Sequence, residues 1–317
     1  MQNSLEIRPN IDSEDEETKE YFSEDEPKIV PKKELKRGTK KKQKQLEKKI
    51  PDDDSESMTS TQSEAFGSCY DQIINCLHLS YIPEVLPCRD EEKEIIESFI
   101  EIGLQNHGSS TSLYISGVPG TGKTATALEV INNMKNKKLF KFIHMNGMQL
   151  KNPNAIFSLI YKEITGKKAK PQSAAVCLND YFKRRKDLTE NQLKNETSIV
   201  LLVDELDALI NKKQNVLYNL FNWPSNKNSG LTILAIANTM DLPERFLPKI
   251  KSRIGETRLV YKCYNQQQIE DIISDRLGGN EIFEKYAIKF VAKKVSSFSG
   301  DIRRALQVCK RAVEIAK

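Results

Sequence analysis

The sequence predicts an α/β fold with a five-stranded parallel sheet, preceded by a disordered tail and followed by a small all-helical domain. Three observations indicate it. A phosphate-binding motif lies between a strand and a helix, two later strands are wholly apolar, and the apolar spacing becomes purely helical near the end. We expect the tail to cover residues 1–66, the α/β domain 67–263 and the helical domain 264–317.

The expected tail is strongly charged. Residues 1–27 hold ten acidic and two basic residues, whereas residues 28–49 hold eleven Lys/Arg and two Glu. Such segments bury too little apolar surface to offset the entropy cost of folding, so we expect disorder. The basic block is typical of a nuclear-localisation segment or a nucleic-acid contact; the alternative is a solvated linker.

Composition excludes several classes of protein. No apolar run approaches the roughly 20 residues that span a bilayer, and the first residues lack the apolar core of a secretory signal. The six cysteines show no C-x-x-C spacing and the three histidines form no cluster, which argues against a zinc site or a disulfide framework. We therefore expect an intracellular protein without a membrane contact.

The phosphate-binding motif is Gly-Val-Pro-Gly-Thr-Gly-Lys-Thr, residues 117–124, between the apolar stretch 113–116 and a helical pattern. It matches G-x-x-x-x-G-K-[ST], in which glycines let backbone N–H groups approach a triphosphate closely. Lys123 supplies a charge to the β- and γ-phosphates, and Thr124 supplies a hydroxyl ligand for Mg²⁺. The alternative is a glycine-rich turn before an ordinary helix. The expected nucleotide-binding residues are Gly117, Val118, Pro119, Gly120, Thr121, Gly122, Lys123, Thr124 and Ala125.

Two carboxylates follow a strongly apolar strand at residues 199–203. Ligands of open α/β sheets bind at the carboxyl ends of strands, so we expect Asp204 and Glu205 beside the phosphate-binding loop. Asp204 would hold Mg²⁺, and Glu205 would accept a proton from an attacking water. Taken alone, the pair also fits a polar turn at a strand end.

A second apolar strand, residues 231–237, ends at Asn238. This carboxamide is placed to orient the attacking water or to contact the γ-phosphate, although asparagine is also common in turns. Between the two strands we expect one helix over 206–221.

The remaining pattern predicts strands at 140–145 and 257–261 and helices at 91–104, 152–165 and 174–185. The last two helices carry a basic surface, which on charge alone fits a solvent-exposed face. Four consecutive basic residues stand at its end: Lys183, Arg184, Arg185 and Lys186. From Asn265 onwards three helices are expected, over 265–277, 282–298 and from Asp301 to the end.

The order of these motifs resembles the AAA+ ATPases of the initiator and clamp-loader clade. Within that clade, VLLVDELDALI, LYNLFNWP and SGDIRRALQVCKRAVEIA are similar to the family of the largest subunit of the eukaryotic origin recognition complex, over residues 69–317. The resemblance implies ATP as the nucleotide and a helical lid as the second domain.

The resemblance also implies roles for residues with weak local signals. Asn238 corresponds to the sensor-1 residue, and Arg303 of Gly-Asp-x-Arg to the sensor-2 arginine, with Arg304 as the alternative. Arg253 corresponds to an arginine finger that acts in trans on a neighbouring subunit. Pro87 and Arg89 lie where the adenine pocket begins. The helix pair 152–187 corresponds to an insertion facing the DNA backbone, with Lys183, Arg184, Arg185 and Lys186 as candidate contacts.

The family often has a winged-helix domain after the lid and a bromo-adjacent homology domain before the ATPase. Neither pattern is present in these 317 residues. We therefore expect a fragment, an incomplete gene model or a reduced natural version.

These expectations combine into an ATP-binding and ATP-hydrolysing subunit of the origin recognition complex, acting in the nucleus. Its expected partners are the other subunits of a hetero-oligomeric ring, double-stranded DNA and a helicase-loading factor. The alternatives are the related helicase-loading factor itself and a non-catalytic ATP-binding scaffold. The presence of both Asp204 and Glu205 argues against the scaffold.

Overall fold

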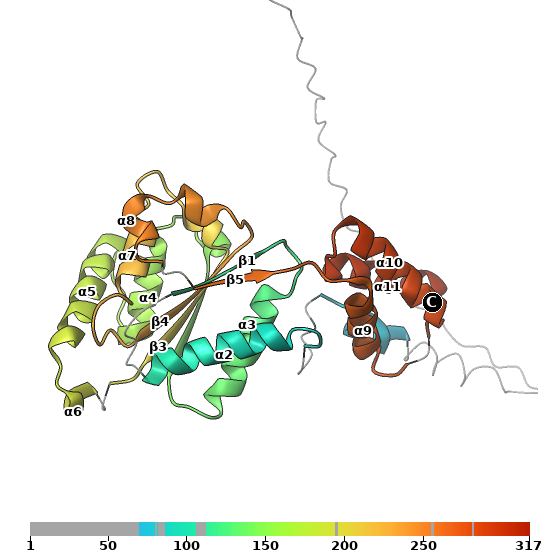
Figure 1. The fold of residues 1–317 in the computed structure, drawn as a ribbon, viewed down its shortest axis with the longest axis horizontal. Helices are drawn as coiled ribbons and strands as arrows, with labels where there is room; N and C mark the ends of the chain where they lie inside the picture. The colour runs from blue at the N-terminus through green and yellow to red at the C-terminus, as the bar shows by residue number, and fades with distance from the viewer. Residues whose placement is uncertain are drawn as a thin grey trace, which may run out of the picture. The chain divides into compact units, whose positions relative to one another are not determined.

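A computed structural model of the protein describes residues 70–79, 81, 86–105, 112–193, 196–254, 257–280 and 282–317. The expected tail, residues 1–66, lies outside this range. Within it, five parallel strands form one sheet in the order β2-β3-β4-β1-β5, with a helical lid after it, which confirms the predicted fold class (Figure 1). The strands are β1 (Ser112–Gly117), β2 (Lys141–Asn146), β3 (Ile199–Asp204), β4 (Leu231–Ala237) and β5 (Arg258–Tyr261).

The position of each strand explains its sequence. The three central strands β1, β3 and β4 are buried at every residue, because helices cover both faces of the sheet. The edge strands β2 and β5 alternate between buried and more exposed residues. Parallel pairing aligns Ser116 with Ala237 and Val203 with Ala235, so the carboxyl ends of the central strands meet at one edge.

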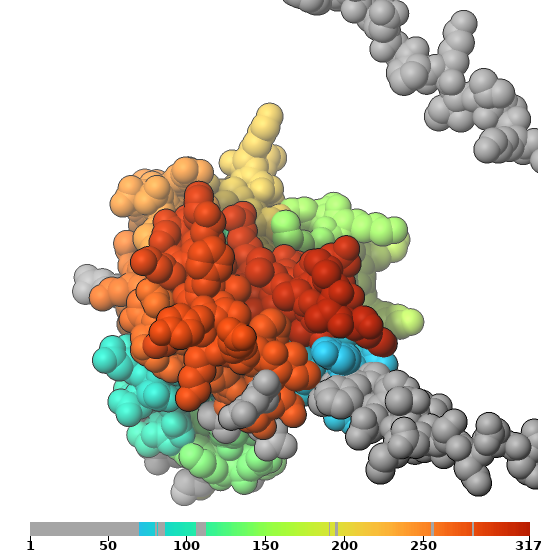
Figure 2. All heavy atoms as spheres, turned by 90° about the vertical axis from the view of Figure 1, so that its right-hand side faces the viewer, coloured from blue at the N-terminus to red at the C-terminus, as the bar shows by residue number. Residues whose placement is uncertain are grey.

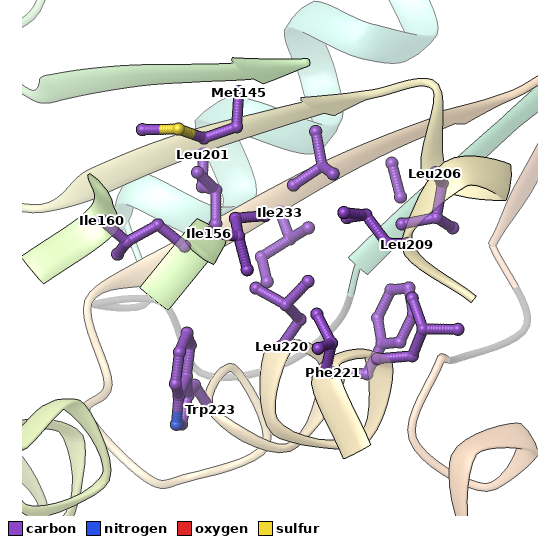
Figure 3. Close-up of a cluster of buried hydrophobic side chains, with 14 of the residues drawn as sticks. Met145, Ile156, Ile160, Leu201, Leu206, Leu209, Leu220, Phe221, Trp223 and Ile233 are labelled. Atoms are coloured by element: carbon purple, nitrogen blue, oxygen red, sulfur yellow. The ribbon is translucent and has the colours of Figure 1, made fainter. Parts of the chain in front are cut away.

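Two hydrophobic cores lie on opposite faces of the sheet. Helices α2 (Asp90–Gln105) and α3 (Lys123–Lys135) build one, whereas α4 (Ala155–Thr165), α5 (Pro171–Arg184) and α7 (Asn215–Asn222) build the other. The second core includes Trp223, Ile156 and Leu220 (Figure 3). The Trp223 ring lies 5.1 Å from that of Phe182 and 5.8 Å from that of Phe157, and its indole N–H donates to Asn179 Oδ1 at 2.6 Å.

The single helix expected over 206–221 is wrong. A short 3-10 helix, Leu206–Leu209, is followed by a turn in which Gln214 has a left-handed φ of 49°, and only then does α7 begin. The polar stretch Asn211–Gln214 offers no apolar side chain to pack on the sheet, so it does not continue the helix. The other short elements are η1 (Gly147–Gln149), η2 (Arg185–Asp187), α6 (Glu190–Leu193), η4 (Leu242–Arg245) and α8 (Pro248–Lys251).

The lid consists of α9 (Gln266–Leu277), α10 (Lys285–Phe298) and α11 (Ile302–Ala316), which share a third core. Figure 2 views the molecule from the side on which these lid helices lie, drawn in orange to red. Asn265 begins α9 with a reciprocal capping box with Gln268, as expected from the sequence. A helical segment at residues 70–76 contributes Ile73 to the lid core, although we expected it in the α/β domain. No helix in the described ranges is long and apolar enough to cross a bilayer.

Candidate nucleotide site

A cavity of about 320 Å³ lies between the carboxyl edge of the sheet and the lid. Ligand pockets are typically about 300–1,000 Å³, so its size suits a small molecule. Its lining is polar at the sheet edge, with Lys123, Thr124, Asp204, Glu205 and Asn238. Away from the sheet edge the apolar lining includes Leu79, Leu86, Pro87, Ile272, Ile302 and Leu306, and the lid also contributes the charged residues Asp275, Arg276 and Arg303.

The glycines of the phosphate-binding loop serve two purposes. Gly120 and Gly122 have φ values of 77° and 87°, which favour glycine. They also lie against the lid: a Cβ on Gly120 would lie 1.7 Å from Asp301 Oδ1, and one on Gly122 would lie 2.5 Å from the Tyr264 hydroxyl. The Ile302 N–H at the start of α11 donates to the Gly120 carbonyl at 3.3 Å. The lid therefore packs directly on the loop.

Lys123 lies at the centre of the polar half. Only 5% of it is exposed, and its Nζ donates to the carbonyls of Gly117 and Val118 at 2.8 and 3.0 Å and to Asn238 Oδ1 at 3.1 Å. Burial lowers the pKa of Lys123, while the negative charges of Glu205 and Asp204 act in the opposite direction. A buried ammonium group beside the cavity is suited to bind an anion.

Thr124 and Asp204 form the second pair. The Thr124 hydroxyl donates to Asp204 Oδ2 at 3.0 Å, and the other carboxylate oxygen accepts the Glu205 N–H at 2.9 Å. A hydroxyl and a carboxylate side by side are the hard oxygen ligands that Mg²⁺ prefers when it is bound together with phosphates. The residues present therefore fit a magnesium nucleotide.

Glu205 and Asn238 complete the sheet edge. Asn238 Nδ2 donates to Glu205 Oε2 at 2.5 Å, so the carboxamide bridges Glu205 and Lys123. Burial raises the pKa of Glu205, and the charges of Asp204 and Asp207 raise it further. A carboxylate with a raised pKa is a stronger base, as a general base requires. The backbone at Glu205 has a left-handed φ of 53°, and a Cβ on Gly147 would lie 2.4 Å from the Glu205 carbonyl oxygen.

Sequence reasoning missed Asp207, the last residue of Asp-Glu-Leu-Asp. Its carboxylate accepts the Asn238 N–H at 2.8 Å and the Thr239 hydroxyl at 2.7 Å. It therefore fixes the backbone that carries the carboxamide. Its position in the sequence indicates this role, since Asp207 lies three residues after Asp204, at the same strand end.

The lid contributes Arg303 to the cavity. Its guanidinium binds Asp301 through two hydrogen bonds, Nε to Oδ1 at 3.1 Å and Nη2 to Oδ2 at 3.0 Å, and the hydrogen bond to Asp301 raises the pKa of Arg303. Arg304, the alternative, is not among the residues that line this cavity. It lines a second hollow beside Cys263 and Phe298, which Arg303 lines as well. Tyr264, Asp275 and Arg276 also line the cavity, and no local motif singled them out, because only the fold brings α9 to the loop.

Of the two residues expected at the adenine pocket, only Pro87 lines the cavity. Arg89 is not among the described lining residues, contrary to expectation. Arg89 is 3% exposed, stacks over the rings of Tyr261 and Tyr264 at 5.0 and 4.1 Å, and donates to Glu92 at 2.6 Å. It therefore joins the α/β domain to the lid rather than contacting a ligand.

Arg253 lies outside its own subunit's cavity. Its Nε donates to Asn222 Oδ1 at 2.7 Å, its Nη1 donates to the Lys249 carbonyl at 2.9 Å, and its guanidinium lies 5.0 Å from the centre of the Tyr218 ring. Its role in trans stays a prediction.

The basic run that spans the end of α5 and the start of η2 is not uniform. Lys183, Arg184 and Lys186 are exposed, but Arg185 is only 2% exposed. Its guanidinium donates to Glu196 Oε2 at 2.9 Å and to the Tyr181 hydroxyl at 3.1 Å. Arg185 is therefore wrong as a candidate DNA contact, since its charge is used inside the fold.

Comparisons with known proteins identify the family of this chain. The chain matches the model of the AAA family, ATPases associated with various cellular activities, over residues 113–260, and that of the Cdc6/ORC-like ATPase lid domain over residues 264–317. It is 44% identical over 247 residues to origin of replication complex subunit 1B of Arabidopsis thaliana, covering 76% of this chain and 30% of that protein. It is 44% identical over 248 residues to origin recognition complex subunit 1 of Homo sapiens, covering 76% and 28%.

Solved structures agree as well. A chain in the structure of Drosophila ORC bound to DNA is similar with a TM-score of 0.68 and 36% identity, over 86% of this chain and 65% of that one. The Aeropyrum pernix ORC1 protein in complex with DNA is similar with a TM-score of 0.62 and 25% identity, over 77% and 64%.

The fold and the site define an AAA ATPase domain, and the chain belongs to that family, in the group with a Cdc6/ORC-like lid. Within this group its sequence is similar to subunit 1 of the origin recognition complex in plants and animals, and it spans about 30% of the length of these curated relatives.

Proposed function

We propose that the chain is the ATP-binding and ATP-hydrolysing part of an origin recognition complex subunit 1, and that it switches assembly on DNA during replication initiation. The observation that carries the proposal is the continuous hydrogen-bonded edge from Lys123 through Asn238 to Glu205, beside the Thr124–Asp204 pair. It supplies a phosphate-binding cation, hard oxygen ligands and a base in one cavity.

In the proposed reaction the loop N–H groups and Lys123 hold the triphosphate. Thr124 and Asp204 would hold Mg²⁺, which when bound neutralises charge on the phosphate oxygens. Glu205 accepts a proton from water as the water oxygen bonds to the γ-phosphorus and the bond to the β–γ bridging oxygen breaks. Asn238 keeps Glu205 and Lys123 aligned, and Arg303 approaches the γ-phosphate from the lid.

The test measures ATP affinity and turnover separately for wild type, Lys123→Ala and Glu205→Gln. We expect Lys123→Ala to weaken binding, and Glu205→Gln to bind normally but to hydrolyse about 10²–10⁴-fold more slowly. Lys135→Ala, an exposed lysine on the same helix, is the matched control. If wild type hydrolyses ATP and Glu205→Gln does so equally fast, the base assignment is refuted; if wild type binds ATP but shows no hydrolysis above background, alone or with partner subunits, the non-catalytic scaffold is favoured.

We also propose that the chain acts in the nucleus with other origin recognition complex subunits, a helicase-loading factor and double-stranded DNA. Arg253 would complete the site of the neighbouring subunit, because its guanidinium lies outside the cavity of its own chain. Hydrolysis by the isolated chain should then be slow. Arg253→Ala should lower the turnover of the assembled complex without changing ATP binding to this chain, and unchanged turnover would remove the role in trans.

The exposed residues Lys183, Arg184 and Lys186 are the remaining candidate DNA contacts. Contacts to phosphates should give salt-sensitive and largely sequence-independent binding. Loss of affinity in the triple alanine variant supports this proposal, whereas unchanged affinity returns the surface to a solvated face.

A further inference from the structure

The cavity wall at Leu86 is fixed by an ion pair that does not itself line the cavity. Lys93 on α2 and Glu129 on α3 form this pair, with Nζ 3.0 Å from Oε1. The Leu86 N–H donates to the second oxygen, Glu129 Oε2, at 3.3 Å, and Lys93 Nζ donates to the Leu86 carbonyl at 2.6 Å. The backbone N–H and C=O of one residue, Leu86, are thus bound by the two members of one ion pair.

The residue held by this ion pair lies in the part of the cavity that suits the base of a nucleotide. Leu86 and Pro87 belong to the apolar half of the cavity, opposite the polar half that suits phosphates. A nucleotide has one flat, largely apolar part, its base, so the base belongs in this half. Glu129 lies four residues after Ala125, on the helix that begins with the phosphate-binding lysine. The ion pair therefore sets the distance between the base wall and the phosphate loop.

Burial shields this ion pair from solvent screening, unlike an ordinary surface contact. The side chains of Lys93 and Glu129 are 16% and 9% exposed. By contrast, Glu101 on α2 pairs with Lys138, which follows the end of α3, at 2.7 Å; their side chains are 41% and 35% exposed, and within the described residues neither is hydrogen-bonded to Leu86. Exposed pairs of the second kind contribute little to stability. The Lys138–Glu101 pair is therefore a control for an ion pair that links these two segments without a hydrogen bond to Leu86.

We propose that Lys93 and Glu129 are positioning residues that hold the Leu86–Pro87 wall for the base, and so set affinity and selectivity for the base of the bound nucleotide. The inference rests on the proposed function, because it needs a nucleotide in the cavity. It separates the ligand into two parts: the wall acts on the base, and the loop acts on the phosphates.

The experiment compares two ligands, ATP with Mg²⁺ and inorganic tripolyphosphate with Mg²⁺, by calorimetry. Lys93→Met and the near-isosteric Glu129→Gln are expected to bind ATP about tenfold more weakly, the loss expected from a hydrogen bond to a charged group. Both should bind tripolyphosphate as wild type does, within about twofold, and their preference for ATP over GTP should fall. Lys138→Met should leave both affinities unchanged.

A charge-reversed double variant tests the mechanism more directly. Lys93→Glu with Glu129→Lys keeps an ion pair between the helices but cannot donate to the Leu86 carbonyl from position 93 or accept its N–H at position 129. We expect ATP binding to stay weak in this variant while thermal melting returns towards wild type.

Several results would overturn the inference. One is recovery of ATP affinity in the charge-reversed variant, another is an equal loss for tripolyphosphate, and a third is a Lys138→Met loss as large as that of Lys93→Met. A wild-type chain that binds neither ligand would contradict the proposed function and this inference with it, whereas wild-type ATP binding that Lys93→Met and Glu129→Gln leave unchanged contradicts this inference alone.

Discussion

Replacing Arg185 with Met should destabilise the protein and leave DNA binding unchanged, although Arg185 stands in a run of four basic residues. Besides its bonds to Glu196 and Tyr181, its Nε donates to the Asn228 carbonyl at 3.4 Å. The guanidinium also lies against Gly230, where a Cβ would be 2.3 Å from Nη2. The side chain therefore joins the end of α5 to the turn before β4.

The size of the loss follows from these contacts. Removing one member of a buried ion pair costs about 3–5 kcal/mol when the remaining charge stays buried. The Glu196 side chain is 40% exposed, so water can solvate its carboxylate after the substitution. We therefore expect a loss of about 2–3 kcal/mol in the free energy of unfolding. At about 2–4 °C for each kcal/mol in a domain of this size, the melting temperature should fall by roughly 4–12 °C.

The assay pairs thermal melting with DNA binding at several salt concentrations. The matched variant replaces Lys183, Arg184 and Lys186 with alanine. It should melt within a few degrees of wild type, and each lost phosphate contact should reduce the slope of log K against log salt by about 0.9. If Arg185→Met melts as wild type does but binds DNA more weakly, our account of Arg185 is refuted.

Three further predictions concern the cavity. As the pH falls, kcat/KM should decline at a pH above the ordinary pKa range of a glutamate, because the pKa of Glu205 is raised and the proposed base is its carboxylate form. In Asn238→Ala this decline should begin at a still higher pH in a pH–rate profile, since the carboxamide hydrogen bond lowers the pKa of Glu205. Gly120→Ala should weaken ATP binding and lower the melting temperature more than Gly166→Ala, which has a similar φ, 73° against 77°, but no neighbour within 4 Å; equal effects would exclude a contribution from the lid contact. Asp207→Ala should lower kcat while the Kd for ATP changes less than about twofold, because its hydrogen bonds orient the carboxamide and not the phosphates; an equal loss in binding would contradict that role.

The sequence was sufficient where a residue's environment follows from its own neighbours in the chain. The apolar strands β3 and β4 are buried on both faces, and a polar residue directly after such a strand must emerge at the sheet edge. That reasoning predicts that Asp204, Glu205 and Asn238 lie together, and hydrogen bonds connect them in the structure.

The sequence was insufficient where a side chain's partner is distant. Arg89 and Arg185 each lie beside charged residues in the chain and resemble exposed residues. Their burial depends on Tyr264 and the Asn228 carbonyl, 175 and 43 positions away, and no local spacing reveals such partners. The apolar half of the cavity has the same origin, since Leu86 and Leu306 meet only through the fold.

The contacts between the loop and the lid suggest how nucleotide binding and assembly are connected. Asp301 packs on Gly120, begins α11 by accepting the Arg303 N–H, and binds the Arg303 guanidinium. One carboxylate therefore contacts the phosphate-binding loop, the start of a lid helix and the arginine that faces the cavity. A phosphate that attracts Arg303 must compete with Asp301 for the same guanidinium, and any shift of Asp301 acts on α11 and the loop together. We therefore propose that the lid responds to a bound nucleotide through Asp301 as well as through Arg303.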